Sequence, residues 1–121
     1  MPEASSKPEQ LRECIKAFAA RIVRLYGALP AKTAPQVLGK QLLWSGTSVA
    51  ANYRTVCRAR TPPEFKAKIG VVLEEADESV FWLELLAETG VVSGRLEPLM
   101  KEARELTAIF TASAETARAN L

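Results

Sequence analysis

Basic residues gather on one face of a predicted helix and around the turn that follows it. Arg54 and Arg58 are four residues apart, so they project from the same side of a helix. Arg60, Lys66 and Lys68 follow around the turn. Cationic side chains clustered in this way can neutralise the phosphates of RNA or DNA, with an affinity that falls as the salt concentration rises. A solvated basic face, or arginines paired with acids, is the alternative interpretation.

Tyr53 precedes Arg54 and is the aromatic residue best placed to stack on a nucleic-acid base. No RNA-recognition motif, zinc finger or glycine-rich loop accompanies these residues in the sequence. The chain has 16 Lys and Arg residues against 14 Asp and Glu residues, a net charge of only +2. The case for nucleic-acid binding therefore depends on local clustering and not on overall charge.

An acidic cluster follows in the next predicted helix, at Glu74, Glu75, Asp77 and Glu78. Like charges four residues apart repel one another unless something neutralises them. A carboxylate-only magnesium or calcium site and paired-carboxylate acid–base chemistry are the weaker alternatives. Across a short antiparallel turn Arg54 is expected near Ala67 and not near these acids. We therefore expect any contact between the arginines and the acids to join two subunits.

Catalytic and metal chemistry find little support in the sequence. The chain has 0 histidines, which removes the commonest general base and metal ligand. Cys14 and Cys57 have no CxxC spacing, and we expect them to be reduced, buried thiols. No catalytic residue, metal site or cofactor is predicted. A small all-helical enzyme that uses arginine and glutamate across subunits is the least favoured function class.

The elements that must position these residues are helices. Apolar residues recur at spacings of three and four, which predicts helices over 8–26 and 35–58 and two more after residue 61. Thr61 and Glu64 form a capping box at the start of the third helix, and Gly90 closes it. The fold class is all-α, an antiparallel up-down-up-down four-helix bundle. We expect one domain over residues 8–121, preceded by a flexible leader over residues 1–7.

Small residues between Ser45 and Ala51 permit close approach of another helix. Asn52 lies on the core side of that helix, where a buried amide fixes register or, alternatively, contacts a ligand. No apolar run approaches the length of a membrane span, and the first residues lack the apolar segment of a signal peptide. We expect a cytoplasmic protein with no membrane partner.

The third predicted helix is apolar on more than one side. Val71, Phe81, Trp82 and Leu85 lie off its core stripe. A helix of this kind is normally buried on several faces, and each large side chain so buried contributes about 1.5–3 kcal/mol. We therefore predict an oligomer interface formed by these four residues with Glu74 and Glu78. A broad core face with one stray exposed aromatic residue is the alternative.

The central part of the chain resembles the bacterial four helix bundle protein family, also called 23S rRNA intervening-sequence proteins. In that family a helix with S-x-x-x-N leads into an R-[ST]-x-x-E-F turn, and a long helix with E-x-x-E follows. The matching positions are Ser48 and Asn52, then Arg60, Thr61, Glu64 and Phe65, then Glu74, Glu75, Glu78, Trp82 and Leu83. Many members carry A-E-G after the asparagine, where this chain has Tyr53, Arg54 and Thr55.

The resemblance implies a small cytosolic bundle that assembles as a ring-like homopentamer. It also implies a distant similarity to the accessory variability determinant of diversity-generating retroelements, a basic pentameric barrel that associates with nucleic acid and a reverse transcriptase. Together with the residues above, it predicts a non-enzymatic homopentamer that binds nucleic acid or a nucleic-acid-processing partner. The expected partners are copies of the chain itself, RNA or DNA, and a reverse transcriptase or other nucleic-acid enzyme. A purely structural protein–protein interaction module without nucleic-acid affinity is the alternative.

Overall fold

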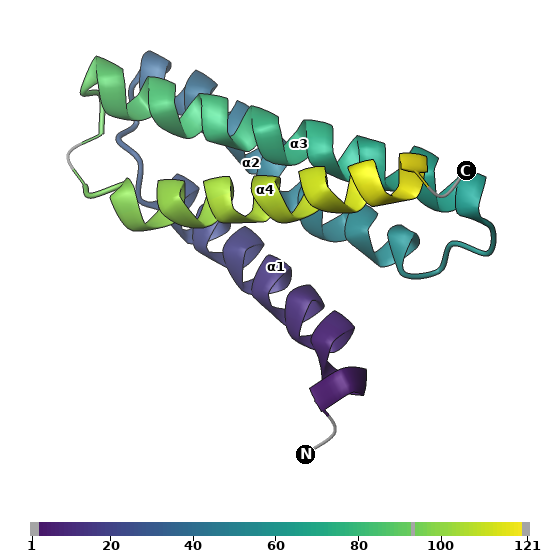
Figure 1. The fold of residues 1–121 in the computed structure, drawn as a ribbon. Helices are drawn as coiled ribbons and strands as arrows, with labels where there is room; N and C mark the ends of the chain where they lie inside the picture. The colour runs from purple at the N-terminus through teal and green to yellow at the C-terminus, as the bar shows by residue number, and fades with distance from the viewer. Residues whose placement is uncertain (1–2, 93, 120–121) are drawn as a thin grey trace.

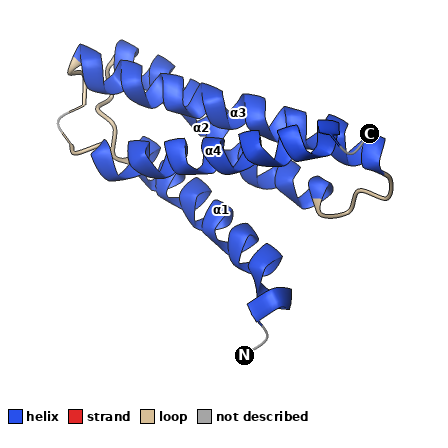
Figure 2. Cartoon of the chain, viewed as in Figure 1, coloured by secondary structure: helices blue, strands red, loops and turns tan. Residues whose placement is uncertain are grey.

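The computed structural model of the protein describes residues 3–92 and 94–119, which form four helices joined by loops (Figure 1). The helices are α1 (Glu3–Gly27), α2 (Thr33–Val56), α3 (Pro62–Thr89) and α4 (Glu97–Ala119). Within the described ranges there is no strand (Figure 2). The predicted all-α four-helix bundle is confirmed, with α1 and α3 running in one direction and α2 and α4 in the other.

The ends of two helices differ from those expected from the sequence. α1 begins at Glu3 and so includes part of the predicted leader, because the polar residues before Pro8 can continue a helix without adding to its apolar stripe. Residues 1 and 2 lie outside the described part of the chain. α2 runs from Thr33 to Val56, two residues earlier at each end than predicted. None of the helices in the described residues is long and apolar enough to cross a membrane.

The turn between α2 and α3 is held by the predicted capping box. The Thr61 hydroxyl accepts a hydrogen bond from the backbone N–H of Glu64 at 3.2 Å, and the Glu64 carboxylate accepts one from the backbone N–H of Arg60 at 2.9 Å. The first contact satisfies an N–H that the first turn of the helix leaves unpaired. The second differs from the usual capping box, because the glutamate accepts from Arg60, the residue before the N-cap, and not from Thr61 itself. At the other end, α3 stops at Gly90, whose φ of 68° lies in the left-handed region that favours glycine.

The core lies along the predicted stripes of all four helices. Its fully buried large side chains are Ile15, Phe18, Ile22, Leu42, Val49, Ile69, Val72, Leu83, Leu86 and Phe110. Two buried hydroxyls, Ser45 of α2 and Ser79 of α3, are 3.0 Å apart and hydrogen-bond each other. This pair fixes the antiparallel register of α2 and α3. Nine residues beyond Ser45, Arg54 therefore lies across from the region near Gly70, about one helical turn before the acidic cluster begins at Glu74.

α1 packs most closely on α2. A Cβ atom added at Gly46 would collide with Cδ1 of Ile22, and one added at Gly39 would collide with Leu29 and come within 3.0 Å of Tyr26. The glycines thus allow the two helices to approach closely, as the small residues of α2 predict. α1 contacts α4 over a shorter length, and its N-terminal end diverges from the other three helices (Figure 1).

Candidate nucleic-acid interface

Three arginines converge at one end of the α1/α2 surface. Arg12 of α1, Arg54 of α2 and Arg58 of the turn after α2 line a hollow of about 350 Å³, together with Cys57. None of the three arginines makes an ion pair within the described residues. We call Arg12, Arg54 and Arg58 the arginine cluster. Unpaired guanidinium groups gathered around a hollow have the chemistry that binds phosphate.

Helix geometry explains how these residues meet. The sequence predicts Arg54 and Arg58 on one helix, but α2 ends at Val56 and Arg58 lies in the turn that follows. Its backbone N–H donates to the Thr55 carbonyl at 3.1 Å, which keeps the chain coiled beyond the end of α2 and the two arginines on the same hollow. Arg12 joins them because α1 runs antiparallel to α2, and Gly46 lets the two helix axes come close. Arg12 was missed from the sequence, because only the packing of α1 on α2 brings it beside residues that are more than forty positions away.

Tyr53 is half-buried beside the arginine cluster. Its ring centroid is 5.8 Å from that of Phe110, with the two rings tilted by 40°. Burial raises the pKa of its hydroxyl, and the neighbouring Cys57 raises it further. The predicted stacking face is therefore largely used in packing against the core, and only part of the ring is open to a ligand.

The predicted basic residues of the α2–α3 turn behave differently from one another. The side chains of Arg60 and Lys66 are exposed and make no ion pair within the described part of the chain. The Lys68 ammonium instead lies 2.7 Å from the Glu64 carboxylate. This contact and the N–H of Arg60 hold the pKa of Glu64 below its usual value. Lys68 is thus the least available of the predicted phosphate contacts.

A groove of about 510 Å³ continues from the arginine cluster along α1 and α2. Its lining is mostly apolar and small, with Ile15, Ala19, Ala50 and Ala51. Lys16 adds a further cation on the α1 side, and like Arg12 it was not predicted from the sequence. The groove and the arginine cluster together form a hollow surface in which cations outnumber the single lining acid, Glu13.

The predicted oligomer interface lies on the outer side of α3. Val71 is 43% exposed and Phe81 is 51% exposed, whereas Trp82 and Leu85 are partly buried. Trp82 packs edge-on against Phe81, with 4.8 Å between the ring centroids. On neighbouring α2, Trp44 is 74% exposed. The structure therefore leaves large apolar side chains uncovered along this surface.

The acids lie on the same side of α3. Glu74 and Glu78 are exposed and make no ion pair in the described residues. One carboxylate oxygen of Glu75 is buried without a hydrogen-bond partner. Burial, with the charges of Glu78 and Glu74, raises the pKa of Glu75. No group of three or more metal-ligating side chains occurs in the described ranges.

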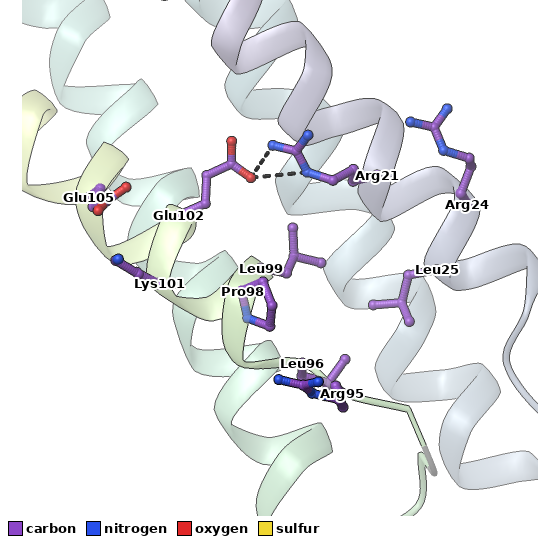
Figure 3. Close-up of a pocket in the computed structure, with 10 residues that line it drawn as sticks. All are labelled: Arg21, Arg24, Leu25, Arg95, Leu96, Pro98, Leu99, Lys101, Glu102 and Glu105. Atoms are coloured by element: carbon purple, nitrogen blue, oxygen red, sulfur yellow. Dashed lines mark hydrogen bonds and ion pairs between the residues drawn. The ribbon is translucent and has the colours of Figure 1, made fainter.

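A second cation-lined cleft, of about 670 Å³, lies between α1 and the start of α4 (Figure 3). Leucine side chains and Pro98 form its apolar part, and an ion pair between Arg21 and Glu102 bridges the two helices. Arg24 points away from the leucines in this view. Because Glu102 and Glu105 offset part of its charge, this cleft is a weaker phosphate site than the arginine cluster.

Two expectations about single residues need correction. Cys14 and Cys57 are exposed, not buried, because Cys14 lies on the outer face of α1 and Cys57 follows the end of α2 at its C-cap. Asn52 is only partly buried, and its amide donates a 2.9 Å hydrogen bond to the Ser48 carbonyl one turn earlier. The spacing of Ser48 and Asn52 in the sequence therefore corresponds to a local contact within α2.

The comparisons with known proteins place the chain. The model of a family described as 23S rRNA-intervening sequence protein matches residues 10–112. The chain belongs to this family. A crystal structure from Bacteroides thetaiotaomicron, described as a protein of unknown function from the S23 ribosomal protein family, is 33% identical to this intervening-sequence protein. The similarity covers 85% of this chain and 96% of that one, with a TM-score of 0.77. No curated protein matches the chain.

The family assignment confirms the resemblance that the sequence suggested. It names no activity for the intervening-sequence protein, and the description of the solved relative assigns none. The distant similarity to the accessory variability determinant stays a prediction. What the chain binds must therefore be argued from its own surface.

Proposed function

We propose that this intervening-sequence protein is a non-enzymatic, self-assembling bundle that binds nucleic acid through the arginine cluster. The observation that carries the proposal is the convergence of Arg12, Arg54 and Arg58 on one hollow with no acid paired to them in the described residues. Arg60 and Lys66 extend the same cationic surface around the α2–α3 turn. Phosphate groups spaced along a nucleic-acid strand are the ligands that such a surface suits.

Single-stranded RNA is the form of nucleic acid that we favour. The hollow is small, and Tyr53 offers only part of an aromatic ring, so the contacts would be mainly to the backbone and weakly sequence-specific. In the other form of the proposal, the protein binds a reverse transcriptase or another nucleic-acid enzyme instead of the nucleic acid itself.

Self-assembly is the second part of the proposal. Phe81, Val71 and Trp44 are exposed on one side of α2 and α3, and burying such side chains favours association. Several copies in a ring would bring several arginine clusters into one particle, which raises the avidity for a long strand. We propose a homopentamer, as the family resemblance implies.

Fluorescence anisotropy with labelled single-stranded RNA tests the nucleic-acid part. Each phosphate neutralised on a single strand contributes about −0.7 to the slope of log affinity against log salt. Five cations from one subunit give a slope of roughly −3.5, or about a hundredfold loss of affinity between 50 and 200 mM salt. Arg54→Glu with Arg58→Glu should abolish binding.

The matched control is Arg24→Glu with Lys101→Glu, which makes the same change of charge at the α1/α4 cleft. It should retain most of the affinity. Equal loss in both double variants would show that overall charge and not the arginine cluster binds RNA. Negligible RNA binding by the unmodified protein would leave the alternative, a protein–protein interaction module.

A further inference from the structure

The outer side of α3 carries apolar and acidic side chains that the described chain neither covers nor neutralises. Phe81 is half exposed, and Glu74 and Glu78 flank it on the same side of the helix without a cation. The orphaned oxygen of Glu75 lies within the same acidic stretch. We call Glu74, Glu78 and Phe81 the α3 ridge. Its chemistry calls for a partner that is apolar at one point and cationic a short distance away.

A contact between the α3 ridges of two copies is disfavoured by their charge. It would place the four carboxylates of Glu74 and Glu78 from the two copies in one interface, with no cation on either ridge to offset them. The charges therefore favour a contact that joins two different surfaces of the chain.

The α1 edge of the α1/α2 groove has the complementary properties. Lys16 projects from it without an ion pair in the described residues, and Val23 is 49% exposed. The groove beside them is lined by small apolar residues, among them Ala19 and Ala50. This edge is thus cationic at one point and apolar further along.

The spacings of the two surfaces agree. Val23 follows Lys16 by seven residues, and Phe81 follows Glu74 by seven residues, so each pair lies on one helix face about two turns apart. α1 and α3 run in the same direction within the bundle. α1 is inclined to α3 in the bundle (Figure 1). Copies arranged around a common axis therefore bring α3 of one copy across α1 of the next, with the two helices running in the same general direction.

We propose that the α3 ridge of each copy seats on the α1 edge of the next copy, with Glu74 against Lys16 and Phe81 against Val23. The inference depends on the proposed self-assembly and gives it a specific contact. Glu78, one turn from Glu74, lies within reach of the same lysine. Because the contact joins two different surfaces of the chain, it is heterologous, and repeating it builds a ring where the rotation between neighbouring copies closes.

Charge exchange tests this contact by sedimentation velocity over a range of concentrations, without nucleic acid. Lys16→Glu alone should raise the concentration for half-assembly by roughly tenfold or more, and so should Glu74→Lys with Glu78→Lys. The three substitutions combined in one chain should restore assembly, because each contact is again between opposite charges. Lys101→Glu, at the α1/α4 cleft, is the matched control and should leave assembly unchanged.

The outcomes separate this contact from the proposal beneath it. If the unmodified protein is a monomer at tens of micromolar, self-assembly itself is refuted. If it assembles but Lys16→Glu has no effect, or if the combined variant does not recover, the contact proposed here is wrong while self-assembly stands. Circular dichroism of each variant confirms folding. Val23→Asp, an exposed substitution, provides a second test and should weaken assembly without any change at Lys16.

Discussion

Replacing Gly46 by alanine tests the close approach of α1 and α2 on which the arginine cluster depends. The added methyl group would meet Cδ1 of Ile22 and lie 3.3 Å from its Cγ2 atom. Ile22 is completely buried, so its side chain has little room to turn away. Either the isoleucine takes a strained rotamer or α1 moves outward.

The expected cost combines two opposing effects. Overpacking of a core costs about 1–3 kcal/mol, whereas alanine favours a helix over glycine by about 0.5–1 kcal/mol. The net destabilisation of Gly46→Ala is therefore between about 0 and 2.5 kcal/mol. Ile22→Val removes the colliding Cδ1 atom and by itself costs about 0.5–1.5 kcal/mol. In the double variant the collision is relieved, so the two costs should fall short of additivity by about 1 kcal/mol.

Urea denaturation of the four proteins at one fixed concentration measures this coupling. The fixed concentration matters because self-assembly would add to the apparent stability. Additive costs in the double variant would refute the reasoning, since they would mean that Gly46 and Ile22 do not contact each other. Gly70→Ala, where an added Cβ atom meets nothing within 4 Å, is the matched control and should not destabilise the chain.

Three further predictions concern the framework. Thr61→Ala, which removes the acceptor for the Glu64 N–H, should lower the free energy of unfolding by about 1 kcal/mol in urea denaturation; no change would show that the capping box is unimportant. Because the pKa of Glu75 is raised above 4.5, the folded chain loses stability as the pH rises through that pKa, so Glu75→Gln should be more stable than the unmodified protein at pH 7, with a difference that disappears near pH 4. A difference that grew towards low pH would contradict this sign. Ser79→Ala should lower the free energy of unfolding by about 0.5–1.5 kcal/mol, because it leaves the Ser45 hydroxyl without its partner. Adding Ser45→Ala to that variant should lower it by a smaller amount, because both members of the buried pair are then absent.

The helices and their core stripes could be predicted because they depend on short-range periodicity. Leu42, Val49 and Val56 are buried at the positions that the three-and-four spacing indicates, and the Thr61–Glu64 cap depends on neighbours within one turn. The arginine cluster was only half predictable. Arg54 and Arg58 are close in the sequence, at the end of α2 and in the turn after it, but Arg12 reaches them only through the crossing of α1 over α2, which no local pattern encodes.

The environment of the cysteines was also not predictable from their residue type. A free cysteine is usually buried, and that average preference gave the wrong environment for both Cys14 and Cys57. Cys14 lies on the outer face of α1, away from the apolar stripe, and Cys57 lies at the C-cap of α2, where the helix ends. The average burial of a residue type is therefore weaker evidence for the environment of a side chain than its position relative to the apolar stripe.

The glycines of α2 couple packing to the proposed function. Gly46 permits the contact with Ile22 of α1, and the same approach carries Arg12 to Arg54 and shapes the groove beside Lys16. An outward movement of α1 would therefore disturb both the phosphate site and the surface proposed to receive the α3 ridge. Gly46→Ala should then weaken RNA binding even though residue 46 touches no ligand, and Ile22→Val should partly restore it. If the Gly46→Ala, Ile22→Val double variant recovers both its free energy of unfolding and its affinity for RNA, then the close crossing of α1 and α2 supports both properties.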